Sequence, residues 1–183
     1  MKKIMVMCFI VLVLLSGTVF ADFNAKIGMD FMGSMDLSYE GTGVNLDVNP
    51  SFTVAGEYSV PLDNDVELGT GVSLQAPRLS AEEGASDDDT YNFISLYGLA
   101  KYDLDQIYLL GQLGYSVFNT SDVSDTNLST IGGLYYGMGA GMYISEQVFG
   151  ELLYSVNNGG ITDNIDTVDV KNSQLSLMVG VSF

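Results

Sequence analysis

The last nine residues of the chain, 175–183, alternate between two kinds of side chain. Large apolar residues occupy the odd positions, and small or polar residues, with Met178 as the exception, occupy the even positions. Because successive side chains of a strand point to opposite faces, one face of this segment is wholly apolar. A soluble domain could end on such a strand at a sheet edge, whereas a strand between lipid and a narrow polar lumen must have this pattern.

Seven earlier segments alternate in the same way, and each is predicted to be a strand. The eight predicted strands are 23–31, 52–60, 66–75, 94–102, 107–117, 134–144, 148–157 and 175–183. Short turns at 61–65, 103–105 and 145–147 alternate with long loops at roughly 33–50, 76–90, 119–131 and 158–172. Strands of about ten residues with this alternation of connections are typical of a membrane barrel. The sequence therefore predicts an all-β, eight-stranded, antiparallel, up-and-down transmembrane β-barrel.

The first 21 residues have the pattern of a cleaved signal peptide. Lys2 and Lys3 precede an apolar run at 4–15, and 19–21 supply compact residues before the predicted cleavage site. The apolar run is shorter than the roughly 20 residues of a transmembrane helix. Cys8 lies inside the run, which argues against a lipoprotein. We therefore expect a signal peptide at 1–21 and one barrel domain at 22–183.

Composition excludes several functions for residues 22–183. This part of the chain has no histidine, cysteine or tryptophan, so the usual general base and the usual zinc ligands are absent. Four basic residues face 23 acidic ones, a formal net charge of −19. Nucleic-acid binding is not expected, since it requires clustered Lys and Arg. No cofactor and no catalytic residue are predicted.

Aromatic residues on the apolar faces are predicted to form two girdles at the membrane interfaces. Both girdles consist of Tyr and Phe. The short-turn end would carry Phe23, Tyr58, Tyr102 and Phe183, and the long-loop end Phe31, Phe52, Tyr115, Tyr136 and Tyr154.

Six charged residues fall on the polar faces and are predicted to form a polar network in the lumen: Lys26, Asp30, Glu57, Glu67, Lys101 and Glu151. An eight-stranded barrel has room for little more than side chains, and unpaired buried charges are costly. Antiparallel pairing would place Lys26 near Glu57, and Glu67 near Lys101. Three interpretations stay open: a plug of ion pairs, a gated path for small solutes, and, least favoured, a catalytic carboxylate pair.

Two further features have alternative interpretations. Gly137, Gly139 and Gly141 leave the inner wall of one strand without side chains, which makes room for neighbours such as Tyr108 and Phe149 or lines a small cavity. Asp87, Asp88 and Asp89 form the densest acidic run. They are weak candidates for a divalent cation, since their spacing fits no EF-hand, and a solvated loop is the simpler interpretation.

The chain resembles the small eight-stranded outer-membrane β-barrel proteins, of which OmpX and the OmpA barrel domain are familiar types. The signal peptide, the eight strands and the pattern of connections support this resemblance, and residues 97–102 and 111–115 are the most family-like stretches. The resemblance implies that Phe183 acts as a signal to the barrel-assembly machinery. It also implies contact with outer-membrane lipid and lipopolysaccharide, and a monomer. Its known enzymes depend on histidine, which this chain lacks.

We therefore expect a non-enzymatic protein of the outer membrane of a diderm bacterium, exported by its signal peptide. Its role would be structural, or an interaction with a surface partner through four long acidic loops. The alternative is a channel for small solutes or ions through the polar lumen. A soluble lipocalin-like barrel is disfavoured, because the charged residues share a face with the glycines and the opposite face is apolar.

Overall fold

A computed structural model describes residues 22–39, 41–79, 90–120, 128–163 and 166–183. The described chain is built from strands, and it contains no helix that is long and apolar enough to cross a membrane. The predicted signal peptide, 1–21, lies outside the described residues. The strands are β1 (Asp22–Tyr39), β2 (Thr42–Val48), β3 (Ser51–Pro61), β4 (Val66–Gln75), β5 (Arg78–Leu79), β6 (Thr90–Leu104), β7 (Ile107–Thr120), β8 (Ser129–Tyr143), β9 (Val148–Thr162) and β10 (Thr167–Ser182).

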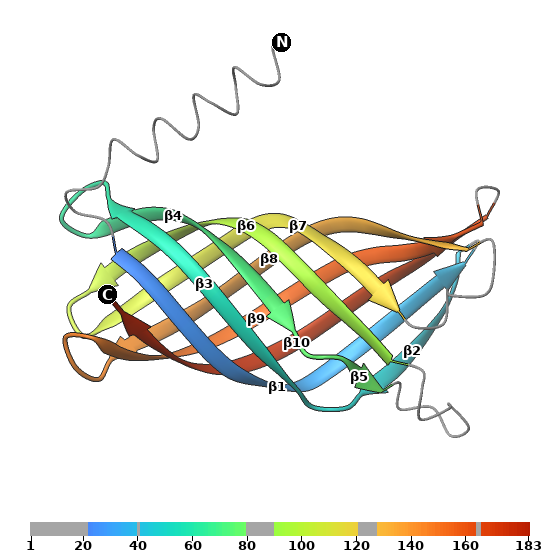
Figure 1. Cartoon of the computed structure of the whole chain (residues 1–183), viewed down its shortest axis with the longest axis horizontal. Coiled ribbons are helices and arrows are strands. Elements are labelled where there is room, and N and C mark those ends of the chain that lie inside the picture. The colour runs from blue at the N-terminus through green and yellow to red at the C-terminus, as the bar shows by residue number, and fades with distance from the viewer. Residues whose placement is uncertain (1–21, 40, 80–89, 121–127, 164–165) are drawn as a thin grey trace, which may run out of the picture.

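Eight long strands form a closed antiparallel ring in the order β1-β3-β4-β6-β7-β8-β9-β10, and β10 pairs with β1 (Figure 1). This ring confirms the predicted up-and-down barrel. The short turns lie together at one end, where the Leu62 amide donates to the Val66 carbonyl at 2.7 Å and the Ile144 amide to the Val148 carbonyl at 2.8 Å. Asp105, in the turn between β6 and β7, has φ of 63°.

The predicted alternation of faces holds along the ring. On β6, for example, Ser95, Tyr97, Leu99 and Lys101 are buried, while Leu96 is 65% exposed. On β7, Tyr108, Leu110 and Gln112 are buried, while Leu113 is 63% exposed. The barrel therefore has polar residues among its buried side chains and large apolar residues on its outer wall, the arrangement that a lipid solvent requires.

The prediction of a loop at 33–50 was wrong. β1 continues to Tyr39, and β2 returns along it from Thr42 to Val48, so this region is mostly strand. A bulge lies between Phe31 and Ser34, and Met32 within it has φ of 49°. The extra residue reverses the faces, because residues with odd numbers point outward before the bulge and Met35 points inward after it. The sequence-based interpretation missed this reversal.

The predicted loop at 158–172 was also too long. β9 continues to Thr162 and β10 begins at Thr167, so paired strands fill most of this range. The predicted loop at 76–90 contains the short strand β5, which pairs with the start of β6. Polar residues made 158–172 look like a loop, although most of its described residues extend the barrel wall at the long-loop end. The described part of this end therefore contains several strand extensions.

An apolar cluster fills the barrel at the long-loop end, where no such cluster was predicted. This outer apolar cluster consists of Met35, Tyr91, Phe93, Phe118 and Val170, with Leu37, Leu46, Val48 and Ile161 packed against it. The Phe93 and Phe118 rings lie 5.1 Å apart. The strand extensions thus have an apolar interior, as a protein surrounded by water does.

Two glycines allow large inner side chains to fit. A Cβ added at Gly141 would lie 2.1 Å from Cζ of Tyr108, and one at Gly180 would lie 2.2 Å from Cζ of Phe149. The expected packing of Tyr108 against the β8 glycines is therefore present. Phe149 lies against Gly180 of β10.

We predict that Gly141→Ala destabilises the barrel by about 1–3 kcal/mol, because Tyr108 must move in a closely packed interior. Gly111→Ala is the matched control, since a Cβ there would meet nothing within 4 Å. The free energy of unfolding of each variant can be measured by urea titration in detergent micelles. Equal stability of the two variants would contradict the assigned packing.

Candidate functional site

The inner wall near the short-turn end contains a buried lysine between two glutamates. Lys26 Nζ on β1 lies 2.8 Å from Glu57 Oε1 on β3 and 2.8 Å from Glu151 Oε2 on β9. All three side chains are at most 1% exposed. The expected pairing of Lys26 with Glu57 is present. Lys26 also pairs with Glu151 on β9, a contact that was not predicted from the pairing of neighbouring strands. Lys26 thus links three strands through the lumen.

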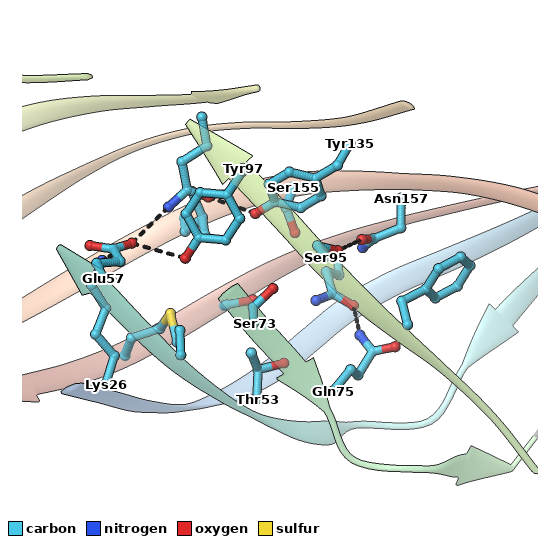
Figure 2. A pocket seen from close by; sticks show the side chains of 17 residues that line it. Lys26, Thr53, Glu57, Ser73, Gln75, Ser95, Tyr97, Tyr135, Ser155 and Asn157 are labelled. Atoms are coloured by element: carbon cyan, nitrogen blue, oxygen red, sulfur yellow. Dashed lines mark hydrogen bonds and ion pairs between the residues drawn. The ribbon is translucent and has the colours of Figure 1, made fainter. Parts of the chain in front are cut away.

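Neutral side chains donate hydrogen bonds to these carboxylates, and Figure 2 shows the surroundings of Glu57. Glu57 Oε1 accepts hydrogen bonds from the Tyr97 hydroxyl at 3.0 Å and from Gln112 Nε2 at 3.1 Å. The Tyr135 hydroxyl donates to Gln112 Oε1 at 2.6 Å. The Tyr108 hydroxyl donates to Glu151 Oε2 at 3.1 Å. Side chains of β3, β6, β7, β8 and β9 therefore meet inside the lumen.

A second lysine lies closer to the short-turn mouth. Lys101 Nζ is 3.8 Å from Glu67 Oε2, the expected pair, and 4.0 Å from Glu57 Oε2. It also lies over the rings of Tyr108, at 5.5 Å from the centroid, and Phe149, at 5.8 Å. Lys101 is 5% exposed. Its charge is therefore balanced by two carboxylates and two aromatic faces.

Asp30 belongs to a separate group nearer the long-loop end. Arg78 Nη2 lies 3.1 Å from Asp30 Oδ2, and hydroxyls of Thr53 and Ser176 donate to the same carboxylate at 2.7 Å and 2.6 Å. Arg78 also donates to Gln174 Oε1 at 2.9 Å. The sequence analysis missed Arg78, which it placed in a loop. The sequence contained a clue to this contact, because Arg78 is the single arginine and Asp30 had no predicted cation.

The space left inside the described barrel is small. A cavity of about 20 Å³ lies among Glu57, Tyr97, Gln112 and their neighbours, room for about one water molecule (Figure 2). A wider hollow of about 140 Å³ opens at the short-turn mouth beside Glu67, Lys101 and Glu146. Three groups lie between this mouth and the long-loop end: Lys26 with its two glutamates, Asp30 with Arg78, and the outer apolar cluster. These three groups occupy the lumen between its two ends.

Within the described residues, no group of three His, Cys, Asp or Glu side chains could hold a metal ion. The acidic run Asp87, Asp88 and Asp89 lies outside the described residues, so its weak candidacy as a cation site stays a prediction. The buried carboxylates are held by cations and hydroxyl donors, and the described lumen brings no serine, threonine or tyrosine together with a histidine base. The geometry fits an ion-paired plug.

The predicted girdle residues lie on the outer wall. Phe23, Phe52, Tyr102, Tyr115 and Tyr154 are between 44% and 60% exposed, while Phe31, Tyr58 and Tyr136 are partly exposed. Phe183 is 73% exposed, and its ring lies 6.2 Å from that of Phe23. The Phe183 amide donates to the Phe23 carbonyl at 2.9 Å, which extends the pairing that closes the ring. The roles of these residues at membrane interfaces and in assembly stay predictions.

Comparison with known proteins identifies the architecture. The family model described as outer membrane protein beta-barrel domain matches residues 8–183. The solved structure of Ail, the attachment invasion locus protein of Yersinia pestis, is similar with a TM-score of 0.52 and 18% identity, over 90% of this chain and 100% of that one. Neisserial surface protein A is similar with a TM-score of 0.52 and 16% identity, over 88% and 97% of the two chains.

The solid-state NMR structure of the outer membrane protein AlkL is similar with a TM-score of 0.53 and 12% identity, over 90% of each chain. Ail has also been solved in complex with the heparin analogue sucrose octasulfate, with the same TM-score of 0.52. No curated protein matches the sequence. At these identities the solved structures establish the fold alone.

We predict that Lys26→Met lowers the free energy of unfolding by about 3–5 kcal/mol, because it leaves Glu57 and Glu151 buried without their shared cation. Lys171→Met on β10 is the control, since Lys171 is exposed at the long-loop end. Urea titration in detergent micelles, with refolded protein, gives both values. A Lys26→Met variant as stable as the control would refute the role of this ion pair in holding the lumen together.

Proposed function

The chain belongs to the outer membrane protein β-barrel family and is an outer-membrane protein, and from this we propose that it is a non-enzymatic surface protein with a closed lumen. Its long-loop end would face the exterior and make the functional contacts, and the short turns would face the periplasm, as in other barrels of this kind. Signal-peptide cleavage after Ala21 and recognition of Phe183 by the assembly machinery are part of this proposal.

The observation that carries the proposal is the filled lumen. Lys26, Glu57 and Glu151 meet at 2.8 Å in its centre, and the outer apolar cluster covers them on the long-loop side. Passage of a hydrated ion would require the separation of buried charges, which costs several kcal/mol. A plug of this kind supports a structural or interaction role more than transport. The absence of histidine and of cysteine after residue 21 supports a non-enzymatic role.

The long-loop end has the charge of an interaction surface. Its described strands expose Asp36, Asp47, Asp166 and Asp169 on or near β1, β2 and β10, with Lys171 as the neighbouring cation. The Asp166 carboxylate raises the pKa of the Tyr39 hydroxyl, a direct effect of this negative field. Ail binds a sulfated ligand in one of its structures. The negative charge here favours basic partners instead.

A channel for small solutes or ions is the second candidate, and the hollow of about 140 Å³ at the short-turn mouth favours it. It would require a conformation in which Lys26 and the outer apolar cluster move aside. Glu57 and Glu67 would then line the path, as the sequence suggested.

We predict that the chain gives no steady single-channel current in planar lipid bilayers, because ion pairs and apolar side chains fill the lumen. The purified barrel is compared with its Glu57→Gln and Glu67→Gln variants. A steady conductance in the unmodified chain that changes when either glutamate is neutralised would overturn the closed lumen and establish the channel.

Orientation can be tested with single cysteines, because residues 22–183 contain none. We predict that Asn45→Cys on β2 reacts with a membrane-impermeant maleimide on intact cells, while Asn64→Cys in the β3–β4 turn reacts only after the outer membrane is permeabilised. Both side chains are exposed, so burial does not limit either reaction. The reverse pattern would place the short turns outside and contradict the proposed surface role of β2 and its neighbours.

A further inference from the structure

An apolar groove lies on the outer wall of β7, β8, β9 and β10, close to the short turns. Its volume is about 350 Å³. The residues whose outer surface lines it are Ile107, Ala140, Met142, Ile144, Gly150, Leu152 and Leu177. Ile107, Met142 and Leu177 are 51%, 55% and 57% exposed, so they face the surroundings of the barrel and not the lumen. The groove is therefore separate from the ion-paired site inside.

The groove exists because two small residues stand among large ones. Ala140 on β8 pairs with Leu152 on β9, and Gly150 on β9 pairs with Met142 on β8. A Cβ added at Gly150 would meet only Ile144 Cδ1, at 3.8 Å, and a backbone carbonyl oxygen, at 4.0 Å. The space above Gly150 is thus left for a molecule from the surroundings of the barrel.

Hydrocarbon is what surrounds this wall, because the chain is an outer-membrane barrel whose large apolar side chains point outward. Lipid tails are as apolar as leucine, so burial of apolar area does not favour one part of the wall over another. A groove nevertheless gives an acyl chain more atoms to touch than a flat or convex wall does. These dispersion contacts are small individually but add up along the chain. The groove should therefore retain one acyl chain in preference to the wall beside it.

Exposed carboxylates lie where the groove meets the short turns. Asp105 in the β6–β7 turn precedes Ile107 by two residues, and Glu146 in the β8–β9 turn follows Ile144 by two residues. A backbone hydrogen bond of 3.0 Å joins these two connections. The two described lysines of this half of the barrel are buried in the lumen. A lipid headgroup here thus meets negative charge, which favours an ammonium and disfavours a headgroup with only a phosphate.

We propose that this groove binds one phospholipid with an ammonium headgroup. One acyl chain lies over Ala140 and Gly150, and the ammonium lies beside Asp105 and Glu146. The short turns face the periplasm in the proposed orientation, so the lipid belongs to the inner leaflet of the outer membrane. The choice of leaflet rests on the proposed function, whereas the site itself rests on the shape and charge of the wall.

The first test fills the groove. The refolded barrel in detergent micelles is titrated with phosphatidylethanolamine, and bound lipids are counted by native mass spectrometry. We expect one lipid to be retained, and Gly150→Leu to lower its affinity about three- to tenfold, because the leucine takes the place of the acyl chain. Gly111→Leu is the matched control, since a Cβ at this outer position of β7 meets nothing within 4 Å and Gly111 does not line the groove. Equal affinity of the two variants would overturn the site.

The second test changes the headgroup. Phosphatidylglycerol with the same acyl chains should bind about two- to fivefold more weakly than phosphatidylethanolamine, the range expected for an exposed ion pair. Glu146→Gln should reduce this difference. Asp65→Asn is its control, because it removes one exposed charge in the β3–β4 turn, which the strand order places across the ring from the β8–β9 turn. Equal binding of the two lipids, or an equal effect of the two variants, would refute the ammonium site.

A photoactivatable lipid locates the site without any substitution. Phosphatidylethanolamine with a diazirine in its acyl chain is illuminated with the unmodified barrel in lipid nanodiscs, and the crosslinked residues are mapped by mass spectrometry. We expect crosslinks concentrated on β7, β8 and β9 near the short turns. Crosslinks spread evenly around the outer wall would overturn the groove, whatever the variants show.

The lipid site and the surface role can fail separately. If Asn64→Cys is labelled on intact cells while crosslinks are concentrated at the groove, the site stands, and the proposed orientation with its leaflet is wrong. If Asn45→Cys is labelled from outside while crosslinks are spread evenly, the surface role stands and the lipid site is refuted. Labelling of Asn45→Cys from outside together with concentrated crosslinks supports both.

Discussion

The structure depends on the placement of Lys26 between Glu57 and Glu151. These residues belong to β1, β3 and β9, strands that lie far apart in the sequence, and their charges meet at 2.8 Å in an interior with little water. Many apolar side chains of the barrel lie on its outer wall, so the interior is held by polar contacts together with smaller buried apolar clusters. Tyr97, Tyr108 and Gln112 donate further hydrogen bonds to these two carboxylates.

A second constraint is the change of solvent along the strands. Within the ring the apolar side chains point outward, while beyond the bulge at Met32 the inward positions hold Met35 and its apolar neighbours. The bulge adds one residue to β1 and so exchanges its two faces. On β6, β7 and β10 the inward positions of the extensions hold Tyr91, Phe93, Phe118 and Val170 without such an exchange. The extended strands at the long-loop end therefore share a buried apolar cluster.

Strands and faces within the ring could be predicted because alternation with period two is a local property of the sequence. The contacts Lys26–Glu57 and Glu67–Lys101 also followed, since each joins strands that are neighbours in the predicted antiparallel ring. Glu151 and Arg78 could not be placed in the same way. Glu151 contacts Lys26 across the lumen, and Arg78 reaches Asp30 from the short strand β5. Both contacts depend on the tilt and diameter of the closed ring. The extension of β1 was missed because of the bulge after Phe31. Met35, Leu37 and Tyr39 alternate with polar residues as in a strand, but they lie on the face opposite to that of the apolar residues before the bulge.

The basic residues are unevenly distributed between the lumen and the rest of the chain. Three of the four basic residues that follow residue 21, namely Lys26, Arg78 and Lys101, are buried beside carboxylates in the lumen. The lumen is therefore nearly neutral, and Lys171 is left as the single cation for all the other acidic residues of 22–183. The strong negative field of the chain thus arises from residues outside the plug, where salt screens it over about 10 Å. Such a field steers a basic partner toward the barrel but is too diffuse to choose among basic partners.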